Sequence, residues 1–498
     1  MFVHLTSSFS PRKSYDVCIV GTGPAGMTLA LKLRAAGLSV FLAEGGEMEY
    51  SDDSQENYLG KVVGDPYFDL DVARLRYFGG TSNHWGGMCR PLEDRDFEGK
   101  KVSPITEWPI RKQDLDPFLP EAREVLEISE NPPDTPFDAD GNLRRVHFVF
   151  SPPVRFAEKY EEQIANDSGL DTCLNCNATA IDYRDGRIAS VHFENYLGHS
   201  IDVSAKAFVL ACGGIENSRL LLHWNRKLNK ILGGGDTVGR YWMEHPTQTV
   251  GGVVFCEGFQ LPDDHVSTPY SRHRLYLAPS SDFIEKNNIL NCRVRLDRLP
   301  GESCEAPSWI KSLLGLEPKR QVEMNWVRTS SEQEPVESNR VALGEEKDRF
   351  GIPRPVLHWR RSELDRKTFR SVALAIGKYF AGGQVGRLKL DDWVLSEELK
   401  FSCDGGGHCP GGYHHTGGTR MAHSSASGVV DPNCRVFGTK NLYVAGSSVF
   451  PSAGYCNPTM SIVQISLRLG DHLAAILTKT ANLDGVRQPK RETAAATE

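Results

Sequence analysis

The sequence lacks a surplus of positive charge. Its 57 lysine and arginine residues face 64 aspartate and glutamate residues, so the formal net charge is −7. Proteins that bind nucleic acids usually carry a basic patch, and this balance argues against that class. Long apolar runs are missing too. The longest have the length of a strand, so we expect no membrane span.

The sequence also lacks a recognisable export signal. Its first dozen residues (MFVHLTSSFSPR) contain neither an apolar region nor a cleavage site. We therefore expect a cytoplasmic location. Export with a partner subunit that carries the signal would leave no trace in this chain and stays open.

Cysteine is scarce, with twelve residues among 498, which excludes a disulfide scaffold and predicts reduced thiols. Cys173 and Cys176 form a C-x-x-C in a strand-like run. Neighbouring strand positions point to opposite faces, so a core or surface pair is favoured over a redox or metal site. Four further thiols would suffice in number for an iron–sulfur cluster, but their spacing matches no cluster pattern and no metal site is expected. They are Cys292, Cys304, Cys403 and Cys409.

The length of the chain exceeds one ordinary core, so we expect two joined domains. Both ends of the chain alternate strand and helix patterns, whereas the middle is rich in strands. We predict an α/β fold: a doubly wound Rossmann-type domain, interleaved with a substrate domain of mixed sheet plus helices. The first domain would take residues 14–249, with an excursion at 50–150, and resume at 401–482. Residues 250–400 would form the substrate domain, and 483–498 a flexible tail.

The clearest local signal is a strand–helix–strand unit over strand 14–20, helix 25–38 and strand 39–44. Further strands are expected at 173–183, 188–193, 206–211, 249–255, 273–278, 289–296, 322–328, 339–343, 355–359 and 441–446. Further helices are expected within 104–127 and at 363–380 and 458–478.

The turn in that unit, GTGPAG from Gly21 to Gly26, has the spacing of a dinucleotide-binding loop. Gly21 allows the tight turn, Gly23 lets the backbone approach a pyrophosphate, and Gly26 lets helix and strand pack closely. Glu44 ends the next strand, where a carboxylate can accept hydrogen bonds from a ribose. The predicted contacts are Gly21, Gly23, Pro24, Ala25, Gly26, Glu44 and Gly45. This loop alone leaves NAD and FAD both open.

Further motifs follow in a fixed order: GGTSNHWGG at 79–87, KAFVLACGGIENSRLL at 206–221, HHTGGTRMA at 414–422 and NLYVAGSSVFPSAGYCNPTMSI at 441–462. In this order they resemble the glucose–methanol–choline (GMC) oxidoreductases, FAD enzymes that oxidise alcohols and sugars. The resemblance covers 14–125, 205–250 and 410–478, and it is thinner over the middle sheet. It implies further FAD contacts at Gly80, Thr81, Asn83, His84, Trp85, Gly86, Gly87, Cys212, Gly213, Gly446, Ser447, Asn457, Pro458 and Thr459.

The resemblance also implies an active site. The family's H-x-x-G-T pattern falls on His415, and its second active-site position, a His or Asn, falls on Asn457. A histidine can remove the hydroxyl proton while hydride leaves carbon for flavin N5, and the asparagine amide can hold the same oxygen. The plain alternative is that His415 is a packed loop residue and that Asn457 caps a helix opening at Pro458. Asn457 can serve in both ways.

Three other histidines are relevant to the predicted site. His245, in YWMEHPT, is assigned to the substrate pocket, with a structural role equally open. His414 is the residue most easily confused with the base. In pyranose 2-oxidases a similar loop bonds the flavin through its histidine, which corresponds here to His84. Because the neighbouring residue differs, we expect non-covalent FAD, with a covalent link through His84 as the alternative.

The closest resemblance is to bacterial pyranose oxidase-like and glucoside 3-dehydrogenase-like enzymes. It implies oxidation of a secondary sugar or glycoside hydroxyl, C3 being the best single choice and a 3-keto sugar the product. Alternatives are a polyol, a non-sugar alcohol or a pyranose 2-oxidase-like reaction. The electron acceptor stays open among oxygen, a quinone, a cytochrome and a partner subunit, and a homo-oligomer is compatible. A flavoprotein for electron transfer or light sensing is disfavoured by the His–Asn pair.

Overall fold

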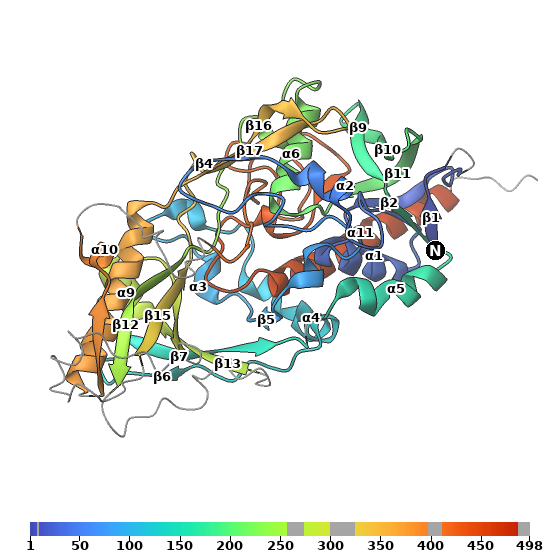
Figure 1. The fold of residues 1–498 in the computed structure, drawn as a ribbon. Coiled ribbons are helices and arrows are strands. Elements are labelled where there is room, and N and C mark those ends of the chain that lie inside the picture. Colours follow the sequence, from blue (N-terminus) through green and yellow to red (C-terminus); the bar gives the residue numbers. More distant parts are fainter. Residues whose placement is uncertain are drawn as a thin grey trace, which may run out of the picture.

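The computed structural model describes residues 1–6, 9–152, 154–255, 273–298, 324–383, 385–396 and 411–486. The strands of this part form two sheets of eight strands and one of three. The two larger sheets lie toward opposite ends of an elongated molecule, and the small sheet lies between them (Figure 1).

The first sheet is the predicted Rossmann-type sheet. Its core strands are parallel, and β10 and β9 extend it as antiparallel strands. Its order is β1 (Phe2–His4), β8 (Leu170–Leu174), β3 (Val40–Ala43), β2 (Tyr15–Val20), β11 (Ser200–Leu210), β10 (Arg187–Glu194) and β9 (Asn177–Arg184), with β19 (Leu442–Val444) also paired to β11.

The strand–helix–strand prediction at the N-terminus is confirmed. Helix α1 (Pro24–Ala35) connects β2 to β3, with proline at its first position, where the missing N–H costs no hydrogen bond. Gly37, at φ +79°, follows the helix end in the left-handed region that favours glycine. The strands themselves are buried on both faces, as expected for a parallel sheet between layers.

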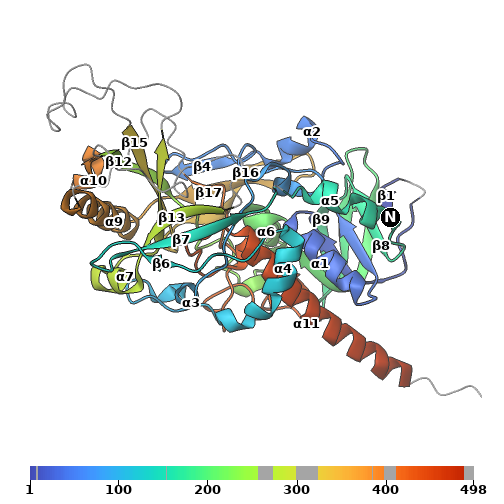
Figure 2. The ribbon, with the colours of Figure 1, turned by 90° about the horizontal axis from the view of Figure 1, so that it is seen from below.

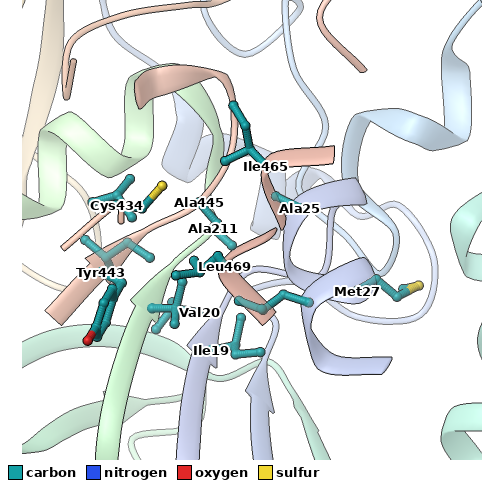
Figure 3. Packing of buried hydrophobic residues seen from close by; sticks show 14 of the residues in the cluster. Ile19, Val20, Ala25, Met27, Ala211, Cys434, Tyr443, Ala445, Ile465 and Leu469 are labelled. Carbon is teal, nitrogen blue, oxygen red and sulfur yellow. The ribbon is translucent and has the colours of Figure 1, made fainter. Parts of the chain in front are cut away.

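The two ends of the chain pack into one core. Figure 3 shows Ala25 of α1 near Ile465 of α11 (Thr459–Val486) and Ile19 of β2 near Leu469 of α11. All four side chains are buried, and the two isoleucines and the leucine are at most 1% exposed. Burying such side chains contributes about 1.5–3 kcal/mol each, and the contact needs residues from both termini. The C-terminal segment therefore packs into the same core as the N-terminal strand–helix–strand unit.

Helix α11 is long and apolar enough over Thr459–Lys479 to span a membrane. However, 61% of its most apolar 18-residue stretch is buried inside the protein. This burial is that of a core helix, since α11 packs along α1. Figure 2 shows its C-terminal end projecting beyond the body. The helix includes the start of the predicted tail, and residues 487–498 lie outside the described part.

The second large sheet is antiparallel at every described pairing, and α9 (Glu363–Gly382) packs on it. It includes three strands from the stretch that the sequence analysis treated as an excursion. Its order is β18 (Gly386–Leu390), β12 (Thr247–Phe255), β15 (Met324–Ser331), β14 (Cys292–Arg298), β13 (His273–Pro279), β7 (Leu143–Phe150) and β5 (Met88–Cys89), with β6 (Thr135–Pro136) paired to β7.

Strands β16 (Arg340–Lys347) and β17 (Pro353–Trp359) were expected in the middle sheet, and this expectation was wrong. In the small sheet β16 pairs with β17, and β17 pairs with β4 (Lys61–Gly64), beside helix α6 (Gly213–Asn225). One strand of the predicted excursion, β4, thus pairs with a strand from a distant part of the sequence, β17.

Two local predictions also differ from the structure. The run 173–183 is broken into β8 and β9 at Asn175, which adopts φ +49°. The segment 104–127 forms short 3-10 turns before a helix of eight residues, α4 (Leu119–Leu126). Pro117 and Pro120 lack the N–H groups that a longer helix would need. The described part of the chain also contains the short helices α2 (Asp52–Gln55), α3 (Asp94–Phe97) and α10 (Asp392–Leu395), and the somewhat longer α5 (Phe156–Asn166) and α7 (Ser281–Asn287).

One buried acid predicts a pH dependence of stability. Burial, helped by the nearby Glu93, raises the pKa of Asp96 to about 7, above the value of about 3.9 in an unfolded chain. The folded state then binds the extra proton, so the free energy of unfolding falls as pH rises from about 4 to 7. Asp96→Asn should reduce the loss of stability between pH 5 and pH 8 by about 2–3 kcal/mol, measured by urea unfolding. Asp53→Asn, at an exposed position, is the control, and an equal pH dependence in Asp96→Asn and wild type would contradict this assignment.

Candidate active site

A cavity of about 540 Å³ runs from the N-terminus of α1 to the loop at 412–415. Its volume falls within the range of roughly 300–1,000 Å³ that is usual for cofactor and ligand sites. Of the site residues predicted from the sequence, all except Gly26, Asn83 and His245 line it. The loops of both chain ends, far apart in sequence, therefore meet around one space.

The nucleotide end of the cavity has the shape that its glycines predict. Gly21 adopts φ +106°, and a Cβ there would lie 2.6 Å from the Ala211 carbonyl oxygen. A Cβ on Gly26 would lie 1.9 Å from the Gly21 oxygen, so Gly26 serves helix–strand packing rather than lining the cavity. A Cβ on Gly23 would meet nothing within 4 Å, which leaves its backbone open to a ligand. The residues present fit a dinucleotide.

The predicted ribose ligand also braces this loop. Glu44 is 6% exposed, and its carboxylate accepts hydrogen bonds from the backbone N–H groups of Thr22 (3.2 Å) and Gly46 (2.9 Å). Asn83, in contrast, turns away from the cavity, because its side-chain amide donates to the Phe78 carbonyl at 2.8 Å.

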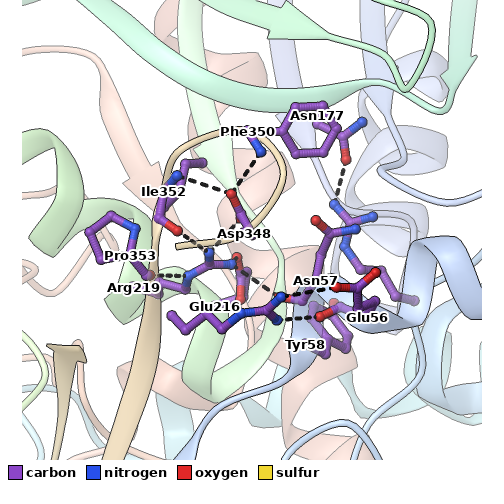
Figure 4. Close-up of polar contacts among 12 residues, drawn as sticks. Glu56, Asn57, Tyr58, Asn177, Glu216, Arg219, Asp348, Phe350, Ile352 and Pro353 are labelled. Carbon is purple, nitrogen blue, oxygen red and sulfur yellow. Dashed lines mark hydrogen bonds and ion pairs between the residues drawn. The ribbon is translucent and has the colours of Figure 1, made fainter. Parts of the chain in front are cut away.

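A buried ionic cluster, which no sequence motif indicates, forms one wall of the cavity. All five N–H groups of Arg219 are paired: with Glu216 at 2.8 Å, with Asp348 at 2.5 Å and with three backbone carbonyls (Figure 4). Arg74 donates to the second oxygen of Glu216 at 3.1 Å. The cluster fixes α6, the excursion and the turn between β16 and β17 to one another.

The loop that carries His415 is held by close backbone approaches. A Cβ on Gly214 would lie 2.6 Å from the His415 carbonyl oxygen, and one on Gly418 would lie 2.5 Å from the Ser218 hydroxyl. The Ser447 hydroxyl donates to the His415 carbonyl at 2.6 Å. These contacts fix the backbone of His415 at the wall of the cavity, so its imidazole has a defined position.

The His415 imidazole contacts a relay of two groups, the half-buried Tyr67 and the buried Glu244. Its Nε2 lies 3.1 Å from the Tyr67 hydroxyl, and that hydroxyl donates to Glu244. Burial lowers the pKa of His415 to about 3, with a smaller effect from the Arg74 charge, so the ring is neutral at pH 7. Burial also raises the pKa of Glu244, and hydrogen bonds from Tyr67 and from three backbone N–H groups oppose that rise.

The two neighbouring histidines pair with each other. The Nδ1 atoms of His245 and His414 are 2.8 Å apart, so one ring donates and the other accepts. Burial lowers the pKa of both rings, which keeps the pair uncharged. His414 lines the cavity, whereas His245 lies behind it. Its assignment to the substrate pocket stays a prediction.

Asn457 faces the cavity with a defined amide orientation. Its Oδ1 accepts a hydrogen bond from Arg293 Nη1 at 2.7 Å, so the NH2 group is left to point elsewhere. Arg293 also donates to the Tyr455 carbonyl at 3.3 Å, and its guanidinium lies over Phe148 at 4.7 Å. Helix α11 begins at Thr459, one residue later than the expected start at Pro458.

Three residues that contact the cavity-lining residues His415, His414 and Asn457 were not predicted from the sequence: Tyr67, Glu244 and Arg293. Glu244 directly precedes the candidate His245 in YWMEHPT, so its position in the sequence offered a signal. Tyr67 lies in the excursion and Arg293 on β14, and neither belongs to a motif. Only the folded chain brings them into contact with residues that line the cavity.

The C-x-x-C pair is buried in the first domain. Cys173 and Cys176 are at most 1% exposed, and burial raises the pKa of the Cys176 thiol well above its usual value. Protonated buried thiols react poorly, which fits a core pair. Cys292 is buried as well, and its proposed companions Cys304, Cys403 and Cys409 lie outside the described residues. Among the described residues, no cluster of three or more His, Cys, Asp or Glu side chains has the arrangement of a metal site.

Family models match both ends of the chain. Residues 335–466 match the model described as GMC oxidoreductase, and residues 15–223 match the model described as pyridine nucleotide-disulphide oxidoreductase. Residues 335–466 are therefore the C-terminal domain of a GMC oxidoreductase. The chain is an FAD-dependent oxidoreductase that acts on alcohols or sugars, and the Rossmann-type domain is its FAD domain.

Individual relatives of this GMC oxidoreductase are distant. A 2-methyl-1,2-propanediol dehydrogenase of Mycolicibacterium austroafricanum is 22% identical over 92% of this chain and 95% of its own. A C-glycoside 3-oxidase of Microbacterium trichothecenolyticum is 26% identical over 80% of this chain and 75% of its own. A solved structure of an FAD-dependent oxidoreductase from Chaetomium thermophilum covers 94% of this chain and 100% of its own, with a TM-score of 0.56 and 15% identity. This last likeness shows the fold.

Gly23→Ala tests the nucleotide end of the cavity. Because a Cβ there has no protein neighbour within 4 Å, the variant should fold and melt like wild type. The Cβ would stand where the pyrophosphate approaches. A lost charge-assisted hydrogen bond costs about 1.5–3 kcal/mol, so FAD should bind about 10- to 100-fold more weakly, measured by flavin absorbance during dialysis. Gly382→Ala, equally uncrowded but at the end of α9, should bind FAD normally. Unchanged retention in Gly23→Ala would exclude this pyrophosphate position.

Proposed function

We propose that this GMC oxidoreductase oxidises a secondary hydroxyl of a sugar or glycoside. His415 is the base that removes the hydroxyl proton, and Asn457 holds the oxygen. The observation that carries the proposal is that both residues line one cavity together with the predicted FAD contacts. A base and a hydrogen-bond donor at one oxygen are what the conversion of a hydroxyl to a carbonyl requires.

The neutral ring of His415 and the amide orientation of Asn457 support these roles. His415 is neutral, so it has a lone pair for the proton. Asn457 presents its NH2 group, because Arg293 occupies its oxygen. An NH2 donor binds an oxygen more strongly as negative charge develops on it, which favours the transition state over the alcohol. When bound, FAD supplies the acceptor for the hydride that leaves carbon.

Oxidation at C3 of a glycoside is the substrate assignment we favour, and the relative named C-glycoside 3-oxidase supports it. The relative named 2-methyl-1,2-propanediol dehydrogenase supports a non-sugar alcohol as the second candidate. A screen of glucosides, free pyranoses, polyols and diols, run with oxygen and with a dye acceptor, separates the two. NMR of the product distinguishes a 3-keto from a 2-keto sugar.

His415→Ala tests the base. The variant should bind FAD, but anaerobic bleaching of the flavin by the best substrate should slow by at least about 10²-fold, the usual contribution of a general base. His423→Ala, at an exposed position outside the cavity, is the matched control and should react normally. Bleaching of His415→Ala at the wild-type rate would place the base elsewhere.

We further propose that FAD is held without a covalent bond. His84 lines the cavity with an exposed side chain, so a bond through it is sterically open and has to be tested directly. After acid precipitation, FAD should stay in the supernatant and the His84 peptide should have its unmodified mass. A yellow pellet with a flavin-bearing His84 peptide would establish the covalent alternative.

A further inference from the structure

We infer that Glu244, acting through Tyr67, sets the tautomer of His415 so that Nδ1 is the ring nitrogen that accepts the substrate proton. This inference rests on the proposed role of His415 as the base. It assigns Glu244 and Tyr67 as positioning residues, which the family resemblance did not point to. The three side chains come from three separate parts of the chain.

The surroundings of Glu244 select its ionised form. The residue is 0% exposed, and its Oε1 accepts from three backbone N–H groups: those of His245 (2.7 Å), His414 (2.8 Å) and Gly412 (3.1 Å). Its Oε2 accepts from the Tyr67 hydroxyl. All four partners are hydrogen-bond donors. A protonated carboxyl group would add a donor hydrogen that has no acceptor among them, so the four contacts favour the ionised carboxylate.

The ionised Glu244 fixes the protons along the relay. The Tyr67 hydroxyl has a single proton, which it gives to Glu244. Its oxygen can then only accept at the 3.1 Å contact with His415 Nε2. Neutral His415 therefore carries its proton on Nε2, and the lone pair is on Nδ1.

Nδ1 is free to meet a ligand. It forms no hydrogen bond with a described residue. It is also not one of the completely buried side-chain nitrogen and oxygen atoms that lack a hydrogen-bond partner. Since His415 lines the cavity, this nitrogen is the one open to it.

The relay also stabilises the product of proton transfer. The hydroxyl proton moves from the substrate oxygen to Nδ1 and no other bond changes, so the ring becomes an imidazolium. Its Nε2–H then donates to the Tyr67 oxygen, in line with the negative charge of Glu244. That charge counters the burial that keeps the pKa of the free ring low, as a buried carboxylate does in a serine-protease triad.

Glu244→Gln is the decisive variant because it changes hydrogen-bond polarity while preserving shape. The amide oxygen can accept the three backbone N–H groups, and the NH2 group then donates to the Tyr67 oxygen. Tyr67 would donate to His415 Nε2, and the ring proton would move to Nδ1. We expect retained FAD, a KM changed by less than about 3-fold and flavin reduction slowed by about 10²-fold or more.

Tyr67→Phe is the second variant and breaks the relay without changing Glu244. Flavin reduction should slow about 10-fold, because neither tautomer is then selected and the imidazolium loses its acceptor. In this background Glu244→Gln should add less than about 3-fold, since residues acting as one unit are not additive. Glu337→Gln, at an exposed ion pair with Arg240, is the control for the substitution itself.

The outcomes separate this inference from the proposed function. If His415→Ala reduces its flavin normally, the proposed base is wrong and the relay falls with it. If His415→Ala is slow but Tyr67→Phe reduces within about 2-fold of wild type, the relay alone is overturned. Independent, multiplicative effects of Tyr67→Phe and Glu244→Gln would also overturn it. Should Glu244→Gln fail to fold, the rate of Tyr67→Phe still decides.

Discussion

Glu244 lies at the point where three segments of the site meet, and its carboxylate holds all of them. It accepts from the backbone of the 412–414 loop, from the residue that follows it and from Tyr67 of the excursion. A buried carboxylate is costly unless its lone pairs are satisfied, so each partner is fixed by the need to pair this charge. The position of His415 next to Tyr67 depends on that constraint.

The same constraint shapes the rest of the cavity wall. Arg219 has acceptors for all five of its N–H groups, and these acceptors come from the excursion, from α6 and from the β16–β17 turn. Arg293 differs, because no carboxylate among the described residues forms an ion pair with it. Its guanidinium donates to Asn457 and lies over Phe148 and Tyr276. Arg219 holds three segments of the fold together. Arg293 directs its positive charge toward Asn457, which faces the cavity.

Local pattern predicted the parts of the structure that depend on local contacts. The strand–turn–helix at Gly21 follows from glycines within six residues of one another, and Glu44 follows at the end of the next strand. His415 and Asn457 were found through motifs. The β4–β17 pairing and the contacts of Tyr67 and Arg293 join residues about 160 to 350 positions apart, and no sequence period reports such contacts. The break at Asn175 was not predicted, because this residue forms a turn with a left-handed backbone inside an otherwise strand-like run.

The residues behind His415 and Asn457 orient these two side chains so that one presents an acceptor to the cavity and the other a donor. Arg293, on the substrate-domain sheet, takes the Asn457 oxygen and leaves a donor for the cavity. Tyr67 and Glu244 take the His415 N–H and leave an acceptor. A hydroxyl group has one proton to give and an oxygen that gains charge as it gives it, so it fits this pair in one orientation. Reversing either polarity would leave two donors or two acceptors facing the same oxygen. The groups behind the site therefore decide what it can bind as strongly as the residues that line it.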